Sequence, residues 1–319
     1  MAAVPASARP VVAARLPWRS AVAAGVVVTL VRPGTWVVAL AGFLAGGGAI
    51  ALAWPITVLP TTSGLQNLLG APISTLAFGD PSPGLVRTAV ILGVLAVVLL
   101  VAGLVVGSWA ERRVIVLDLE EAADEGYTPR PARDGAPGTG HVALLRSLSL
   151  IPPAVVLALA WPAVYGVTYQ ELILPEDLAT PLPVRVIAKV PLQLAALVAA
   201  WLLADAAAAV AVRRLVVERR GVVAAWALGW ADLVRRAHRI VPIALLGDLA
   251  LLLSVGPALA AAAVAWDRVR EALELARSSP AGIAVVALWV GIWLGAVALA
   301  GVGSALRSAL FTLEGALRR

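Results

Sequence analysis

The amino-acid sequence predicts an all-α polytopic membrane protein with six transmembrane helices and with both ends of the chain in the cytoplasm. Hydrophobic residues make up 61% of the chain and charged residues only 14%, whereas an ordinary soluble domain is about half apolar and a quarter charged. The apolar residues are gathered in long blocks, each near the roughly 20 residues that a helix needs to cross the hydrocarbon core. Basic residues collect at alternate ends of these blocks, which sets the expected direction of each crossing.

The spans follow from stretches that are free, or nearly free, of charge. They are expected at residues 35–58, 88–110, 147–170, 190–212, 240–266 and 280–306. In the first span, Trp36 and Trp54 are 18 residues apart, roughly 27 Å along a helix, a distance that suits the two interfaces of a bilayer. The third span carries three prolines, which predict a kink: Pro152, Pro153 and Pro162.

The distribution of basic residues predicts the orientation. Nineteen of the 25 Arg and Lys residues lie in the N-terminal segment, in the loops after the second and fourth spans, and at the C-terminus. The positive-inside rule places that side in the cytoplasm, and an even number of spans agrees with two cytoplasmic ends. Arginine supplies every basic residue except Lys189. This bias suggests a GC-rich bacterial genome, and therefore the bacterial cytoplasmic (inner) membrane.

The N-terminal segment, 1–34, is expected to form an interfacial helix that leads into the first span. Residues 20–31 are an uncharged run behind several arginines, so a cleaved signal peptide is the alternative. That alternative is disfavoured because the run is too short to span and no convincing small-residue cleavage site precedes Arg32. The cytoplasmic loop, 111–142, is expected to continue the second helix as an acidic extension and then to become a linker rich in proline and glycine.

A second interfacial helix is predicted in the cytoplasmic segment 213–239. Trp226, Trp230 and several aliphatic side chains fall on one helical face, whereas Asp232 and the arginines lie largely on the other, as in a helix that lies in the headgroup plane. This surface is expected either to anchor the protein to the membrane or to dock a partner. The basic residues assigned to it are Arg219, Arg220, Arg235, Arg236 and Arg239.

The spans group into three transmembrane hairpins, at 35–110, 143–212 and 240–319. Each hairpin follows a cytoplasmic segment that ends in arginine, with a proline soon after, which suggests an internal repeat. Small residues four positions apart allow helices to approach closely. Helix packing is therefore expected at three glycine pairs: Gly42/Gly46, Gly103/Gly107 and Gly291/Gly295.

Two acidic residues, Asp205 and Asp248, fall inside the predicted spans, where an ionisable side chain is costly and needs a physical reason. Each lies eight residues from the cytoplasmic end of its span, about 12 Å along the helix. Two carboxyl groups at equal depth on consecutive antiparallel helices are expected to share a proton if they meet. This pattern favours either an ion or substrate pathway or a structural contact in which each aspartate binds a backbone group, a hydroxyl or an arginine.

Several classes of chemistry are excluded or disfavoured. The chain has no cysteine, so disulfides, thiolate metal sites and cysteine nucleophiles are excluded. His141 and His238 do not supply the three or four converging ligands of a zinc site, and no metal or cofactor is expected. Ser304 lacks a nucleophile-elbow pattern, and no GxxxxGK(S/T) phosphate loop occurs. The net charge of +6 lies at the ends of apolar blocks, which favours anionic lipid headgroups over nucleic acid as the binding partner.

The segment VRRLVVERRGVVAAWALGWADLVRRAHRIVPIALL, together with LVRPGTW and SALRSALFTLE, resembles bacterial six-span proteins related to the membrane domain fused to some glycerophosphodiester phosphodiesterases. The shared features are a basic N-terminal segment and an amphipathic helix that ends in arginine before the fifth span. The resemblance implies the same topology but carries over no catalytic residue. The soluble phosphodiesterase domain has no counterpart in this sequence, so its activity is not inferred.

The function expected from the sequence is a non-enzymatic membrane scaffold or accessory subunit that acts with a protein partner or with a second copy of itself. The main alternative is a transporter or permease subunit with Asp205 and Asp248 in the pathway, in which case any nucleotide-binding partner would be a separate chain. An intramembrane enzyme that acts on lipid is the third possibility.

Overall fold

The computed structural model describes residues 18–57, 82–128, 137–174, 177, 180–275 and 280–316. Every regular element within these ranges is a helix, and six helical spans among them are long and apolar enough to cross a bilayer. The prediction of an all-α, six-span membrane protein is therefore confirmed. Residues 129–136, within the predicted linker, and residues 58–81, between the first and second predicted spans, lie outside the described residues.

The first span is an interrupted helix rather than the continuous one predicted for 35–58. Helix α1 (Trp18–Val31) precedes α2 (Gly34–Phe43), the π-helical turn η1 (Leu44–Gly48), α3 (Ala49–Ala53) and the 3₁₀ turn η2 (Trp54–Ile56). The irregularity lies at consecutive glycines, and Gly47 has a φ of 101°, a conformation that side chains with a Cβ rarely adopt. The sequence prediction missed this break because it relied on hydropathy.

The second and third spans differ in continuity. Helix α5 (Pro83–Asp124) is one helix of 42 residues, about 63 Å long, so the expected extension beyond residue 110 is part of the same rod. The third span consists of α6 (Thr139–Ser149) and α7 (Ile151–Ile173), which meet at Leu150. Pro152 and Pro153 lie at the start of α7, where a missing backbone donor costs little. The break occurs at these prolines, while Pro162 lies within α7.

The remaining helices complete the bundle. They are α8 (Leu182–Lys189), α9 (Pro191–Glu218), α10 (Val222–Arg235), α11 (Ala237–Leu275) and α12 (Pro280–Ala316). Helix α9 ends at Arg219, which adopts the left-handed conformation with a φ of 56°. This turn brings α10 back against α9, with which it packs closely.

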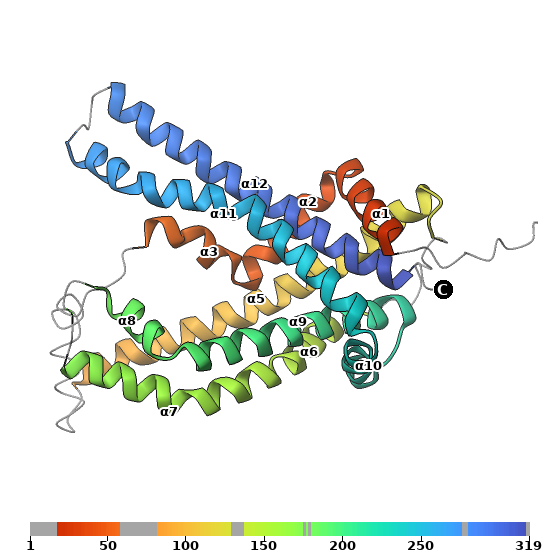
Figure 1. Cartoon of the computed structure of the whole chain (residues 1–319), viewed down its shortest axis with the longest axis horizontal. Coiled ribbons are helices and arrows are strands. Elements are labelled where there is room, and N and C mark those ends of the chain that lie inside the picture. Colours follow the sequence, from red (N-terminus) through yellow and green to blue (C-terminus); the bar gives the residue numbers. More distant parts are fainter. Residues whose placement is uncertain are drawn as a thin grey trace, which may run out of the picture.

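The helices form two arms that diverge from a common base (Figure 1). The upper arm is the hairpin of α11 and α12 beyond the base, and the lower arm contains α7, α8, the first half of α9 and the first part of α5. Helix α2 contacts both α5 and α12. The base consists of α1, α6 and α10 together with residues 111–124, 205–218, 237–248 and 305–316 of the long helices.

Tight packing is concentrated in the base. The largest fully buried side chains include Ile115, Leu145, Leu215, Leu310 and Leu313, all of which belong to it. A run of alanines on α9, from residue 206 to 209, is buried there and lets neighbouring helices come close. In contrast, the most hydrophobic 18-residue stretch of α5 has no buried residue. Such apolar faces suit contact with lipid rather than with protein.

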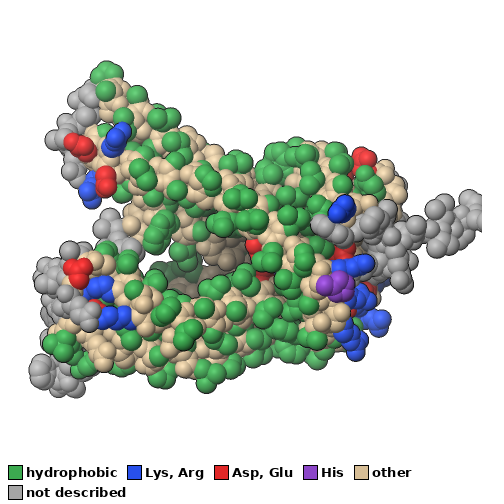
Figure 2. All heavy atoms as spheres, in the orientation of Figure 1, with side chains coloured by type: hydrophobic (Ala, Val, Ile, Leu, Met, Phe, Trp, Pro, Cys, Tyr) green, Lys and Arg blue, Asp and Glu red, His purple; other side chains and the backbone are tan. Residues whose placement is uncertain are grey.

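A hollow separates the two arms and narrows toward the base (Figure 2). Apolar side chains cover most of both arms in this view, charged side chains of both signs lie at the ends of the arms, and basic side chains gather around the base. The hollow thus faces the ends of the arms, away from the arginine-rich base.

Only some of the predicted glycine contacts occur. A Cβ on Gly103 would lie 2.8 Å from the carbonyl oxygen of Ala45, and one on Gly42 would lie 3.2 Å from the Cβ of Ala110. Gly107 also faces Ala45, at 3.8 Å. Among the described residues, the prediction is wrong for Gly46, Gly291 and Gly295, around which a Cβ would meet no atom within 4 Å. Spacing alone does not show which face of a helix meets another helix. Glycines at other tight contacts were missed: Gly229, Gly247, Gly301 and Gly303.

We expect Gly103→Ala to destabilise the protein, because the added Cβ would press on backbone that cannot move aside easily. The expected loss is about 1–3 kcal/mol, as for overpacked cores. Gly291→Ala is the matched control and should be neutral or stabilising by up to about 1 kcal/mol, since alanine is the better helix former. Thermal unfolding of the purified variants, followed by tryptophan fluorescence, measures both changes. Equal midpoints for the two variants would contradict this contact.

Candidate functional site

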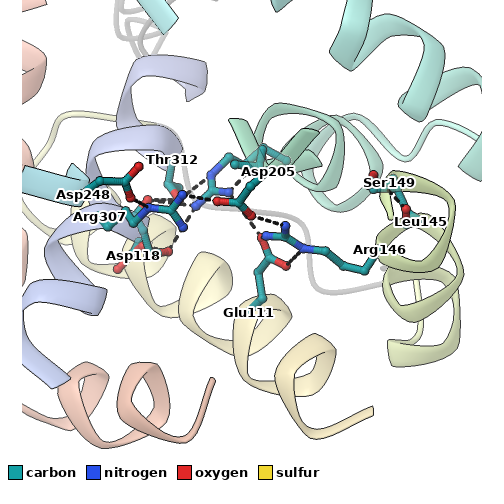
Figure 3. Close-up of polar contacts among 12 residues, drawn as sticks. Glu111, Asp118, Leu145, Arg146, Ser149, Asp205, Asp248, Arg307 and Thr312 are labelled. Carbon is teal, nitrogen blue, oxygen red and sulfur yellow. Dashed lines mark hydrogen bonds and ion pairs between the residues drawn. The ribbon is translucent and has the colours of Figure 1, made fainter. Parts of the chain in front are cut away.

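Five charged side chains meet where the hollow reaches the base, and we call them the ionic network (Figure 3). They come from five different helices: Glu111 of α5, Arg146 of α6, Asp205 of α9, Asp248 of α11 and Arg307 of α12. Buried charges persist only when other charges or polar groups compensate them. The network therefore fixes how these five helices meet.

Arg146 joins α5 to α9 through two carboxylates. Its Nε and Nη2 donate to the two oxygens of Glu111 at 2.7 and 2.6 Å. Its Nη1 donates to Oδ1 of Asp205 at 2.7 Å. The bidentate arrangement with Glu111 uses the planar guanidinium in its strongest pairing mode.

Arg307 links the two predicted pathway residues. Its Nη2 donates to Oδ2 of Asp205 on the lower-arm helix α9, and its Nε lies 2.6 Å from Oδ1 of Asp248 on α11. Asp205 and Asp248 are thus brought into one network, but what they share is a guanidinium instead of a proton. Arg307 is also the charged connection between the upper-arm hairpin and α9.

Arg213 forms a second layer beneath the network. Its guanidinium donates to the carbonyl oxygens of Ala209 and Ser308 at 2.8 and 3.0 Å, and to the hydroxyls of Ser308 and Thr312 at 3.2 and 3.3 Å. It lies 3.6 Å from Oε1 of Glu111. The ring of Phe311 lies under both arginines, at 5.2 Å from Arg213 and 5.8 Å from Arg307.

Asp118 is the acidic member of this second layer. Only 1% of its surface is exposed, and the hydroxyl of Ser308 donates to its Oδ2 at 3.1 Å. Among the described residues, no arginine or lysine forms an ion pair with it. The hydroxyl of Ser308 also accepts from Arg213, so Asp118 is connected to the network through one shared side chain.

The network is balanced in charge once Arg213 is counted, and it is partly accessible. Its three carboxylates face the guanidiniums of Arg146 and Arg307, and Arg213 adds a third guanidinium 3.6 Å from Glu111. The side chains of Asp205 and Arg307 are each 24% exposed, and that of Asp248 is 32% exposed. Figure 2 shows acidic side-chain atoms at the inner end of the hollow, where α9, α11 and α12 converge.

A cavity of about 220 Å³ lies on the base, among α9, α10, α11 and α12. Arg213 lines this cavity and also approaches Glu111 of the network. The second layer therefore separates the hollow between the arms from a smaller space on the arginine-rich side.

Helix α10 forms where the amphipathic helix was predicted, but its faces are distributed differently. Asp232, expected on the outer polar face, is buried and paired with Arg214 of α9. Trp226 and Trp230 are partly buried against the base, and their ring centroids are 6.5 Å apart. The apolar face of α10 is therefore used in part for packing against the other helices. The predicted surface arginines are exposed, and they are Arg219, Arg220, Arg235, Arg236 and Arg239.

Comparison with known protein families, with curated proteins and with solved structures finds no match for this chain. The resemblance to membrane domains of glycerophosphodiester phosphodiesterases therefore stays a prediction. Among the described residues, no group of three or more His, Asp and Glu side chains could hold a metal ion.

Sequence reasoning identified Asp205 and Asp248 but missed their partners. Glu111, Arg146 and Arg307 each lie at the end of an apolar block and were interpreted as markers of span ends. All three lie at ends of predicted spans, whereas the two aspartates lie eight residues inside theirs. The predicted positions therefore gave no sign that these five side chains pair.

We expect the Asp205–Arg307 pair to be strongly coupled in stability. Each single substitution, Asp205→Ala or Arg307→Ala, should destabilise the protein by about 3–5 kcal/mol, toward the lower end because both side chains keep some exposure. The double variant should lose less than the sum of the two. Thermal unfolding of the four proteins measures this coupling. Asp267→Ala, whose side chain is 82% exposed, is the control and should change nothing. Additive losses would refute the coupling.

Proposed function

We propose that this protein is a transporter or permease subunit in which the hollow between the arms is the substrate pathway and the ionic network closes its inner end. The observation that carries this proposal is the position of the network. Five helices direct charged side chains to the narrow end of the hollow, and Asp205, Asp248 and Arg307 keep part of their surface exposed there. A network that served only to hold the helices together would not need charged groups that a ligand can reach.

The closure depends on contacts that can exchange. Arg307 contacts Asp248 within its own arm and Asp205 across to α9. If the contact with Asp205 and the hydrogen bonds from Arg213 of α9 to Ser308 and Thr312 of α12 are released together, the base can loosen while α11 and α12 stay paired with each other. Arg213 would then be the last charged side chain before the cavity on the base. Alternation between these arrangements would give access from one side at a time, with the two states differing by a small number of ion pairs.

We place the base on the cytoplasmic side of a bacterial inner membrane, with both chain ends inside. The support is the concentration of basic residues, since nineteen of 25 belong to the segments on that side. Exposed arginines of α10 would then face anionic headgroups. In this orientation the hollow opens to the outside of the cell.

The absence of native cysteine allows this orientation to be tested directly. Leu174→Cys, at the far end of α7, and Val234→Cys, on α10, replace side chains that are each 77% exposed. A membrane-impermeant maleimide should label Leu174→Cys in intact cells, because that end faces outward. It should label Val234→Cys only in inverted vesicles. The reverse pattern would overturn the proposed orientation.

The scaffold or accessory-subunit function is the second candidate. It is supported by the exposed arginines of α10 and by the apolar arm surfaces, which would suit a protein partner or a second copy of the chain. The two functions differ in one physical requirement. A transport subunit needs arms that change their separation, whereas a scaffold needs arms that keep it.

Spin labels at the ends of the arms distinguish the two functions. With Ile283→Cys on α12 and Leu174→Cys at the end of α7, electron–electron distance measurements in lipid nanodiscs report the width of the hollow. We expect Arg307→Gln to increase a population in which the ends of the arms are closer together. The substitution removes the ion pair between α12 and α9 at the base, and in the proposed alternation a loosened base goes with arms that approach each other. Arg270→Gln, on an exposed part of α11, is the control and should leave the distribution unchanged. A single distance that Arg307→Gln does not alter would contradict transport.

A further inference from the structure

We propose that the inner end of the hollow binds an organic cation with an apolar body, and that the carboxylate of Asp248 is its counterion. This proposal rests on the proposed function, which it extends by assigning the class of substrate. It is carried by three independent features: the uneven compensation of charge in the network, the incomplete pairing of Asp248 and the apolar walls of the hollow.

The first feature is the uneven compensation of charge. Arg146 and Arg307 are each shared by two carboxylates, and Arg213 adds a further cation only beside Glu111. Compensation is therefore weakest at the end of the network away from Arg213, and a carboxylate that lacks compensation away from bulk water is costly. A ligand that brings one positive charge would supply what is missing there, whereas an anion would compete with the carboxylates.

The second feature locates the weakest compensation at Asp248. Asp205 uses both oxygens, one for Arg146 and one for Arg307, and Glu111 is held at both oxygens by Arg146. Asp248 contacts Arg307 through Oδ1 alone, and no described residue pairs with its Oδ2. Its side chain is also the most exposed of the five, at 32%. The free oxygen therefore belongs to the residue that a ligand reaches most easily.

Close packing beside Asp248 maintains this incomplete pairing. A Cβ on Gly247 would lie 2.8 Å from Cγ of Arg307, so the stem of Arg307 lies directly against the backbone of α11. From there the guanidinium meets Asp248 through its Nε edge, while its Nη2 extends to Asp205. The other oxygen of Asp248 is left without a contact from the arginine.

The third feature separates an organic cation from a divalent metal ion. Calcium needs six to eight oxygen ligands, and magnesium needs six in a near-octahedral arrangement. The described part of the site offers one free carboxylate oxygen, and no metal-binding group of acids or histidines occurs among the described residues. An organic cation needs one counterion together with apolar surroundings. Both arms supply such surroundings beside the hollow, and Leu252, one turn beyond Asp248 on α11, is 64% exposed.

Binding at Asp248 would also act on the closure of the hollow. A cation beside Oδ2 draws the carboxylate away from the Nε of Arg307 and weakens the contact within the upper arm. Arg307 then keeps Asp205 as its remaining partner. Occupancy of the site and the state of the ion pairs are thereby linked through one carboxylate.

The test measures binding of radiolabelled tetraphenylphosphonium to the full chain in lipid nanodiscs, with empty nanodiscs to subtract partitioning into lipid. The wild-type protein should bind it saturably. Asp248→Asn should weaken binding at least tenfold, Asp248→Glu should retain most of it, and Asp267→Asn, on the same helix, should leave it unchanged. Tetraphenylborate, which has nearly the same shape and the opposite charge, should not compete.

A comparison that needs no variant guards against misfolding of Asp248→Asn. Tetraphenylphosphonium should raise the thermal midpoint of the wild-type protein, and tetraphenylborate should not. Equal effects of the two ions, undiminished binding by folded Asp248→Asn, or no saturable binding would each overturn the assignment of the cation. The spin-label distances report on the proposed transport function separately. Mobile arms without cation binding refute only the ligand, and bound cation with immobile arms refutes only transport.

Discussion

The structure depends on the requirement that charges removed from water be compensated. Three arginines and four carboxylates meet in the region where the arms join, and they come from five helices. A guanidinium offers five donors in a fixed plane, so Arg146 and Arg307 can each serve two carboxylates at once. This capacity allows few side chains to hold α5, α6, α9, α11 and α12 at a common level.

The same requirement explains the division of the molecule into base and arms. Around the charges, alanine-rich and glycine-rich helix surfaces pack closely and exclude solvent, as at the buried alanines of α9. Beyond them, long apolar helices have little reason to adhere, since lipid chains satisfy their surfaces as well as other helices do. The hollow lies beyond the base, where no ion pair between described residues links the upper arm to the lower arm.

The six spans were predictable because span length and hydropathy are local properties of the chain. The interruption at Gly47 and the unbroken course of α5 were not, since hydropathy is insensitive to backbone conformation. At the site, the cost of placing Asp205 and Asp248 in a span singled them out. Arg146 and Arg307 looked like ordinary flanking residues, because only the tertiary arrangement shows that the ends of three apolar blocks converge on the two aspartates. The prediction for Gly46, Gly291 and Gly295 failed for a related reason: spacing gives a helix face but not its neighbour.

The continuity of α5 has a mechanical consequence. Glu111 and Asp118 are seven residues apart on this helix, about 10 Å along its axis and on nearly the same side. One rigid rod thus carries the acid that engages Arg146 and the acid that engages Ser308. A small roll of the rod would displace both at once, so the two layers cannot loosen one after the other. Any rearrangement that passes through α5 has to be concerted.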